Sequence, residues 1–206
     1  METKTMAETD FFSLSNYIID EKISAFKFTN AYKVYDSNGM QIGTVEQQKV
    51  SGGAKAARML LGSGAKAVQS FQLDIKDING KTLASVQRGG LGSGIRTINI
   101  LDGGGSTLGT IKIVFSMWAP KQEILSPSGE VIGRIQGDWK GWNFEIKDVR
   151  DNVFGTINKK WNGAMKEIFT TADKYLVTIS EDVEKLYRIA IVATAITIDM
   201  VLKESK

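Results

Sequence analysis

The side chains that could do chemistry in this chain are carboxylates, lysines, arginines and a few large aromatic rings. The sequence contains no histidine and no cysteine, which removes the commonest general base, the commonest metal ligand and every thiolate nucleophile. Catalysis by a Cys–His pair or a Ser–His–Asp triad is therefore excluded. The lack of cysteine also fits a reducing compartment. We expect a protein that is not an enzyme.

Neighbouring carboxylates are the remaining candidates for acid–base work. Asp74 and Asp77 form one such pair, and Asp148 and Asp151 form another. Both pairs lie beside or within segments that read as turns, where an Asp side chain accepts hydrogen bonds from the backbone. Turn chemistry already explains both pairs, so we predict a structural role for them.

Basic and aromatic residues are candidates for contact with an anionic lipid or membrane surface. Two tryptophans flank a lysine in the segment 139–142, which suits a membrane interface and equally suits packing at the end of a barrel. The basic and apolar segment 51–67 suits an anionic surface, and a solvated loop is the alternative. The candidate lipid- or anion-binding residues are Lys55, Arg58, Lys66, Lys159, Lys160, Lys166, Trp139 and Trp142.

Length and composition favour a single globular domain. The chain has 206 residues, of which 42% are hydrophobic and 24% are charged, as is usual for globular proteins. Its formal net charge of +3 is far below the excess of a dedicated nucleic-acid binder, so no nucleic-acid partner is expected. Residues 1–10 are polar and lack the layout of a signal peptide. We expect them to be disordered and the protein to be cytoplasmic, with peripheral attachment to a membrane left open.

The segment 186–202 is the longest apolar stretch. It carries no charged residue between Arg188 and Asp199, which is only about half of the roughly 20 apolar residues that a spanning helix needs. A short segment that is apolar on every side is better explained as a helix enclosed by protein. We predict this helix over residues 181–203, with Ser180 as its N-cap and acidic residues in its first turn.

The rest of the chain repeats a pattern that predicts β-hairpins. An alternating apolar run leads into a turn, and a second alternating run with a glycine follows. Asp, Asn and Ser side chains stabilise such turns, and glycine supplies the positive φ that they need. The second glycine predicts a bulge or a close backbone approach. The five predicted turns lie at residues 36–39, 77–80, 102–105, 126–129 and 148–152.

Five hairpins imply about ten strands, and the segment 23–28 adds pairing at the N-terminal end. A meander of this length avoids exposed edges most simply by closing into a barrel. The interior of such a barrel must be occupied by an apolar element, and the apolar C-terminal segment is the candidate. The sequence therefore predicts a mainly β protein, in which a closed antiparallel barrel encloses a C-terminal helix.

Several motifs resemble the phospholipid scramblases. The similar segments are Lys160-Trp161-Asn162-Gly163, residues 166–173, Ile198-Asp199-Met200, Asn143-Phe144-Glu145-Ile146 and Asn30-Ala31-Tyr32-Lys33-Val34. The hairpin pattern alone also suits the related LURP-one-related and tubby-like proteins. The resemblance implies one tubby C-terminal-like domain over residues 11–206, built as a twelve-stranded barrel around a hydrophobic helix.

The resemblance also implies an association with phospholipid membranes and, through the family name, phospholipid scrambling. A non-enzymatic tubby-like module that binds phosphoinositide-like anions or a protein partner is the alternative. The family's calcium-binding segment would fall just before the last helix, and among its ligand positions only Asp173 and Asp182 are carboxylates here. Because calcium prefers six to eight oxygen ligands, the alternative is a turn at Asp173 and a helix start at Asp182.

Overall fold

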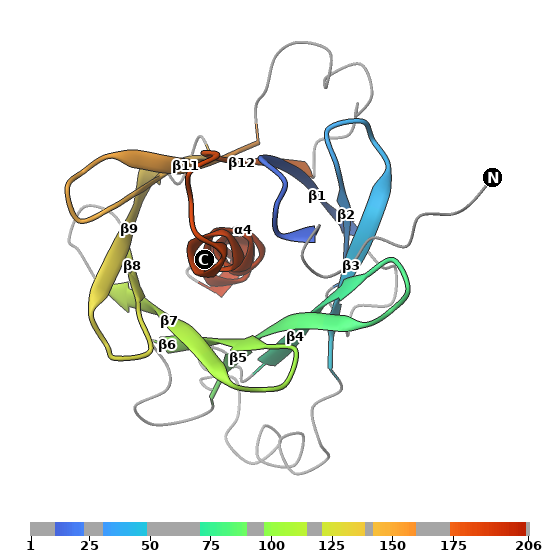
Figure 1. Ribbon diagram of the computed structural model, residues 1–206, viewed down its shortest axis with the longest axis horizontal. Helices are drawn as coiled ribbons and strands as arrows, with labels where there is room; N and C mark the ends of the chain where they lie inside the picture. The colour runs from blue at the N-terminus through green and yellow to red at the C-terminus, as the bar shows by residue number, and fades with distance from the viewer. Residues whose placement is uncertain are drawn as a thin grey trace.

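The computed structural model describes residues 11–22, 31–48, 71–89, 97–114, 121–138, 142–159 and 174–204. These residues form twelve strands and one long helix, and the strands surround the helix (Figure 1). The helix is α4 (Lys185–Glu204). The strands are β1 (Asn16–Lys22), β2 (Ala31–Tyr35), β3 (Gln41–Gln47), β4 (Phe71–Asp77), β5 (Thr82–Arg88), β6 (Thr97–Asp102), β7 (Thr107–Val114), β8 (Lys121–Leu125), β9 (Val131–Asp138), β10 (Asn143–Lys147), β11 (Val153–Asn158) and β12 (Lys174–Ile179).

The barrel closes because β1 pairs with both β2 and β12. All twelve pairings are antiparallel, and each strand from β2 to β11 pairs with the strand before it and the strand after it in the sequence. Closure leaves no free edge among the described strands, which removes the unpaired backbone groups that invite aggregation. The predicted fold, a closed antiparallel barrel around a C-terminal helix, is confirmed. The predicted pairing segment 23–28 lies outside the described residues. The strand that pairs at the N-terminal end in the structure is β1, which ends at Lys22.

All five predicted hairpins are present, and four of their turns use an aspartate in the same way. In the first turn, Oδ1 of Asp36 accepts hydrogen bonds from the backbone N–H groups of Asn38 and Met40, at 2.9 and 2.8 Å. Gly39 completes this turn with a φ of 79°, where glycine has no steric cost. Hydrogen bonds from Asn152 lower the pKa of the equivalent Asp148. These local bonds explain why the hairpins form where the sequence pattern places them.

Each outgoing strand begins with a β-bulge, which lies just before the second glycine of the pattern in four hairpins and just before Ala84 in β5. In β3, Gly43 pairs with Val34 and Gln41 pairs with Tyr35, so Ile42 is the extra residue. A Cβ at Gly43 would overlap the backbone carbonyl oxygen of Lys76. The same shift occurs in β5, β7, β9 and β11. The predicted close approach is therefore present, and such bulges help a sheet to curve.

Helix α4 fills the interior of the barrel. Its ten consecutive residues 189–198 are at most 4% exposed, and they pack against inward-facing apolar residues of the strands. Two interior polar side chains, Gln122 and Thr194, have no hydrogen-bond partner within the described part of the chain. The described residues contain no helix with the length and apolar character needed to span a membrane.

The helix begins at Lys185, four residues later than predicted, and its first turn holds no acidic residue. Ser180 is therefore not its N-cap. The guanidinium of Arg188 donates hydrogen bonds to the carbonyl oxygens of Ser180, Glu181 and Val183. These bonds favour the turn that residues 181–184 form before the helix, because they satisfy carbonyl groups that lie outside it.

Candidate functional site

The structure describes three of the predicted site residues, namely Trp142, Lys159 and Asp182. The others lie outside the described residues: Lys55, Arg58, Lys66, Trp139, Lys160, Lys166 and Asp173. The described part of the candidate site lies on the wall of the barrel and at the end where the even-numbered strands begin, which we call the even-strand end.

Trp142 and Lys159 meet at the even-strand end, where β10 begins and β11 ends. The backbone N–H of Lys159 donates to the carbonyl of Trp142 at 3.0 Å, and the ammonium group lies 4.2 Å from the centroid of the indole ring. The indole ring stacks on buried Tyr175, with centroids 5.2 Å apart and planes at 7°. Trp142 is half-buried against the core. Two predicted site residues thus form one cation–π cluster, in which the indole ring of Trp142 packs against Tyr175.

Asp182 lies in the turn before α4, and its side chain is exposed. Among the described residues, no group of three or more acidic side chains could hold a metal ion. The second predicted ligand, Asp173, lies outside the described residues, so calcium binding by this pair stays a prediction.

Arg188 is a buried cation that the sequence pattern did not single out. It is 7% exposed, and it donates to the carbonyls of Val183 and Glu181 at 2.7 Å, Ser180 at 3.0 Å and Leu14 at 3.1 Å. Carbonyl dipoles, rather than a carboxylate, thus balance its charge. These bonds join the segment before β1 to the turn before α4. The signal in the sequence for Arg188 was its position at the border of the apolar segment.

Tyr17 lies close to this arginine. Its hydroxyl donates to the carbonyl of Phe11 at 2.7 Å. Burial raises the pKa of Tyr17 well above its usual value, and the positive charge of Arg188 opposes part of this rise. The phenol therefore stays protonated and acts as a hydrogen-bond donor that holds the N-terminal segment against the barrel.

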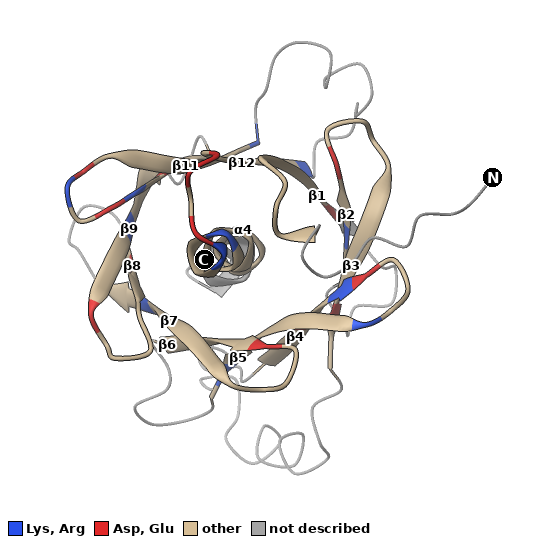
Figure 2. Cartoon of the chain, viewed as in Figure 1, with Lys and Arg blue, Asp and Glu red and all other residues tan. Residues whose placement is uncertain are grey.

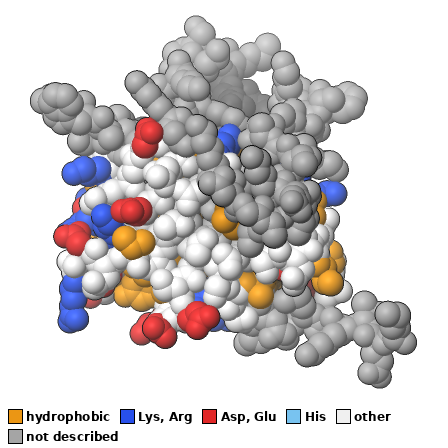
Figure 3. All heavy atoms as spheres, turned by 90° about the horizontal axis from the view of Figure 1, so that it is seen from above, with side chains coloured by type: hydrophobic (Ala, Val, Ile, Leu, Met, Phe, Trp, Pro, Cys, Tyr) orange, Lys and Arg blue, Asp and Glu red, His pale blue; other side chains and the backbone are white. Residues whose placement is uncertain are grey.

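Basic residues gather on the outer face of β7–β10. The strand registers place Lys112, Glu123, Arg134 and Lys147 in one row across these four strands. Arg134 and Lys147 lie directly opposite each other, where like charges destabilise a sheet. Figure 2 shows blue Lys and Arg residues on this wall of the barrel. Along the left side of Figure 3, basic and acidic side chains stand next to one another. The row thus carries more positive than negative charge.

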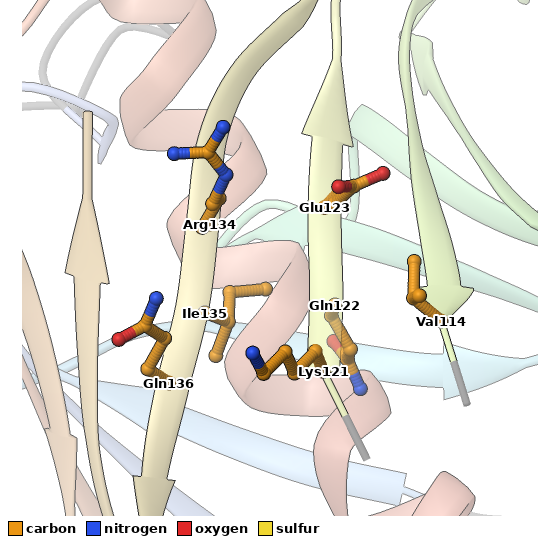
Figure 4. A pocket seen from close by; sticks show the side chains of 7 residues that line it. All are labelled: Val114, Lys121, Gln122, Glu123, Arg134, Ile135 and Gln136. Atoms are coloured by element: carbon orange, nitrogen blue, oxygen red, sulfur yellow. The ribbon is translucent and has the colours of Figure 1, made fainter. Parts of the chain in front are cut away.

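A cavity of about 280 Å³ opens beside this row, on the wall formed by β7, β8 and β9. We call it the β7–β9 groove. Figure 4 shows the carboxylate of Glu123 directed toward β7 and the guanidinium of Arg134 directed upward along β9, while Lys121 lies below them and extends toward β9. The residues that line the groove are Val114, Lys121, Gln122, Glu123, Arg134, Ile135 and Gln136. None of the basic residues here was a predicted site residue, because their convergence depends on strand register.

Comparisons with known proteins agree with this architecture. A solved X-ray structure of a protein from Arabidopsis thaliana matches with a TM-score of 0.58 and 10% identity, over 97% of this chain and 99% of that chain. This likeness concerns the fold. The Saccharomyces cerevisiae protein described as altered inheritance rate of mitochondria protein 25 is 21% identical over 175 residues. That match covers 74% of this chain and 52% of the yeast protein, so the chain spans about half the length of this relative.

A family comparison covers nearly all of the barrel and the enclosed helix. The family model described as Scramblase matches residues 18–205, which include all of the described strands except the start of β1. The match agrees with the resemblance seen in the motifs of the sequence. The chain belongs to the Scramblase family.

Proposed function

We propose that this protein binds anionic phospholipid at a membrane surface through the outer face of β7–β10. The observation that carries the proposal is the row of Lys112, Arg134 and Lys147, interrupted only by Glu123. Arg134 faces Lys147, and Lys147 is already paired with Glu145 at 3.0 Å. An anionic lipid surface would supply counter-charge to Arg134 and to exposed Lys112. Membership of the Scramblase family supports a phospholipid as the ligand.

The occupied interior supports an external lipid contact. Residues 189–198 of α4 are at most 4% exposed inside the barrel, and close packing leaves little room for an acyl chain there. We therefore assign the lipid contact, and any scrambling of lipids, to the outer surface.

The even-strand end provides a second contact in this proposal. Lys121 begins β8 and Trp142 precedes β10, and antiparallel pairing through β9 brings both to the same end of the barrel. Lys159 lies against Trp142 at this end. A cation beside an amphipathic ring suits the region between lipid headgroups and water. The row and this cluster could thus face one membrane together.

The test is co-sedimentation of the purified protein with phosphatidylcholine vesicles, with and without phosphatidylserine. We expect binding only when phosphatidylserine is present, and weaker binding at high salt, because salt screens exposed charges beyond about 8 Å at physiological ionic strength. Equal binding to both vesicles, or no binding to either, would overturn the proposal. Calcium-dependent binding would instead favour a site at Asp173 and Asp182. Binding restricted to phosphoinositide vesicles would favour the tubby-like alternative.

A further inference from the structure

The end of the barrel opposite the even-strand end carries all five hairpin turns, and we call it the hairpin end. The segment before β1 and the connection from β12 to α4 lie at the same end, because the even-numbered strands finish there. Each of these connections falls within the described residues. The exposed side chains and the charge of the hairpin end can therefore be compared with those of the barrel wall.

The exposed large apolar side chains of the described residues all lie at the hairpin end. They are Met40, at 65% exposure, Val149 at 55%, Ile78 at 51% and Val153 at 45%. Each belongs to a hairpin turn or directly follows one. Such turns favour Asp, Asn, Ser and Gly, so turn formation does not call for these apolar side chains. Their restriction to one end indicates a surface that meets a partner.

The four apolar side chains form two pairs. Met40 directly precedes β3 and Ile78 directly follows β4, and these two strands are hydrogen-bonded to each other. Val149 and Val153 belong to the single hairpin of β10 and β11. Figure 1 places the two groups of hairpins on opposite sides of the barrel, with the enclosed helix between them. A partner that covers both pairs must therefore cross the hairpin end.

The turns hold these side chains in place before any partner arrives. Oδ1 of Asp77 accepts hydrogen bonds from the backbone N–H groups of Asn79 and Lys81, at 2.9 and 2.8 Å. Oδ1 of Asp148 does the same for Arg150 and Asn152, at 2.7 and 2.9 Å. Binding to a surface that is already ordered loses little conformational entropy.

Acidic residues surround the apolar pairs. Figure 2 shows them in red in several of the turns and along the connection from β12 to α4. The acidic residues of the connections at this end are Asp36, Asp77, Asp102, Glu130, Asp148, Asp151, Glu181, Asp182 and Glu184, whereas the basic ones are Lys81, Arg150 and Lys185. The hairpin end therefore repels anionic lipid and attracts a cationic partner.

Turn chemistry does not explain the acidic connection before α4. The side chains of Glu181, Asp182 and Glu184 are exposed, and none forms a hydrogen bond or an ion pair with another described residue. By contrast, Lys76 lies 2.7 Å from Glu46 on the wall of the barrel. These three carboxylates are thus open to external cations.

We propose that the hairpin end binds a basic, amphipathic segment of a protein partner. The apolar side chains of this segment cover Met40, Ile78, Val149 and Val153, and burial of that surface supplies affinity. Its lysines or arginines meet the acidic connection before α4, which selects the sign of the partner's charge. The inference goes beyond the proposed function, because a barrel whose even-strand end rests on a membrane keeps its hairpin end in solution.

The first experiment measures binding of two labelled helical peptides by fluorescence anisotropy. One peptide contains leucine and lysine, and the other keeps the leucines and replaces every lysine with glutamate. We expect the wild-type protein to bind the leucine–lysine peptide and to ignore its acidic counterpart. Equal binding of the two peptides, or binding of neither, would overturn the inference.

The apolar contact is tested with the double variant Met40→Ser and Val149→Ser. Both side chains protrude into solvent, so the fold should persist, which circular dichroism checks. Binding of the leucine–lysine peptide should weaken about tenfold, because apolar surface is no longer buried. The control Gln87→Ser with Asn99→Ser, at exposed positions on the outer wall of β5 and β6, should change binding less than about twofold. If the first double variant unfolds, Met40→Ser alone replaces it.

The charge contact is tested with Glu181→Gln and Glu184→Gln together. This variant should bind the leucine–lysine peptide about fivefold more weakly at low salt, and the difference should shrink at high salt. Glu123→Gln with Glu145→Gln removes the same charge from the outer wall of β8 and β10 and should change binding less than about twofold. Equal losses in the two variants would show attraction by net charge alone and overturn the site.

A final arm separates a protein partner from a membrane. Wild type and the variant with Met40→Ser and Val149→Ser are mixed with vesicles of phosphatidylcholine alone. We expect no binding by either protein. Wild-type binding that the double variant loses would assign the apolar pairs to a neutral membrane, which overturns the protein partner. Peptide binding that the double variant leaves unchanged would also overturn the inference.

Discussion

At the scale of single residues, Arg188 shows how this fold buries a charge without an opposite charge. Its guanidinium donates hydrogen bonds to backbone carbonyl oxygens of two separate segments. Leu14 belongs to the segment before β1, and Glu181 belongs to the turn before α4. Breaking such a network leaves several buried acceptors without a donor at the same time. The arginine therefore secures the start of the enclosed helix against the wall of the barrel.

We predict that Arg188→Met lowers the free energy of unfolding by about 3 kcal/mol, since methionine keeps the length of the chain and removes every donor. Urea denaturation followed by circular dichroism measures this difference. Lys112→Met, on the exposed face of β7, is the matched control and should change stability by less than about 0.5 kcal/mol. A similar small change in Arg188→Met would show that the network contributes nothing.

Two interior threonines of α4 allow a second test. The hydroxyl of Thr194 has no hydrogen-bond partner among the described residues, whereas that of Thr197 donates to the carbonyl of Ala193 at 3.0 Å. Valine has nearly the same shape as threonine and no hydroxyl. We predict that Thr194→Val raises the free energy of unfolding by about 1 kcal/mol, because an unpaired polar group leaves the core. The gain is measured as a rise in the midpoint of thermal unfolding. Thr197→Val should give no such gain, and equal effects at both positions would contradict the assignment.

At the scale of elements, the hairpins depend on glycines whose missing side chain lets strands approach. A Cβ at Gly43 would overlap a backbone oxygen of β4, whereas a Cβ at Gly155 would meet the flexible end of Ile191 at 3.1 Å. A backbone atom cannot move away as a side-chain end can. The same sequence position therefore carries different constraints in different hairpins, and Ala84 fills it in β5.

Gly43→Ala should therefore lower the free energy of unfolding by more than about 2 kcal/mol, as overpacking does in other cores. Gly155→Ala is the matched comparison, and it should cost less than about 1 kcal/mol because Ile191 can change its rotamer. Denaturant titration of both variants compares them directly. An equal or reversed order of the two costs would show that the close approach in β3 does not govern the stability of its hairpin.

The hairpins could be predicted from the sequence because their signals are local. An aspartate, a glycine and two alternating runs lie within about fifteen residues of one another. Strand β1 was not predicted at its true place, since Tyr17, Ile18 and Ile19 are all buried and hide the period of two. The start of α4 was misplaced because a tertiary network at Arg188 overrides a local capping signal.

The candidate site was harder to predict, because it depends on pairing between distant strands. Sequence reasoning named Trp142 and Lys159 separately, and only the register of β10 with β11 shows that they meet. It did not name Arg134 or Lys121, which are ordinary alternating residues until β8 and β9 are paired. Isolated charges on strands carry no local signal for a shared groove.

At the scale of the whole molecule, the enclosed helix and the basic wall have separate roles. Helix α4 completes the core and occupies the interior, as its buried residues 189–198 show. In the proposed function, an anionic lipid surface contacts the row on the outer face of β7–β10 and the even-strand end without entering the barrel.

The measurement that tests this account most directly is the vesicle partition of two double variants. Lys112→Gln with Lys147→Gln removes charge from the row but leaves the groove residues intact. We predict a partition onto phosphatidylserine vesicles about 30-fold weaker than wild type, because each basic residue near an anionic surface contributes about 1 kcal/mol. Lys33→Gln with Lys76→Gln, on the distant strands β2 and β4, should change it by less than about threefold. Equal losses in both double variants, or no loss in the first, would contradict lipid binding by the outer face of β7–β10.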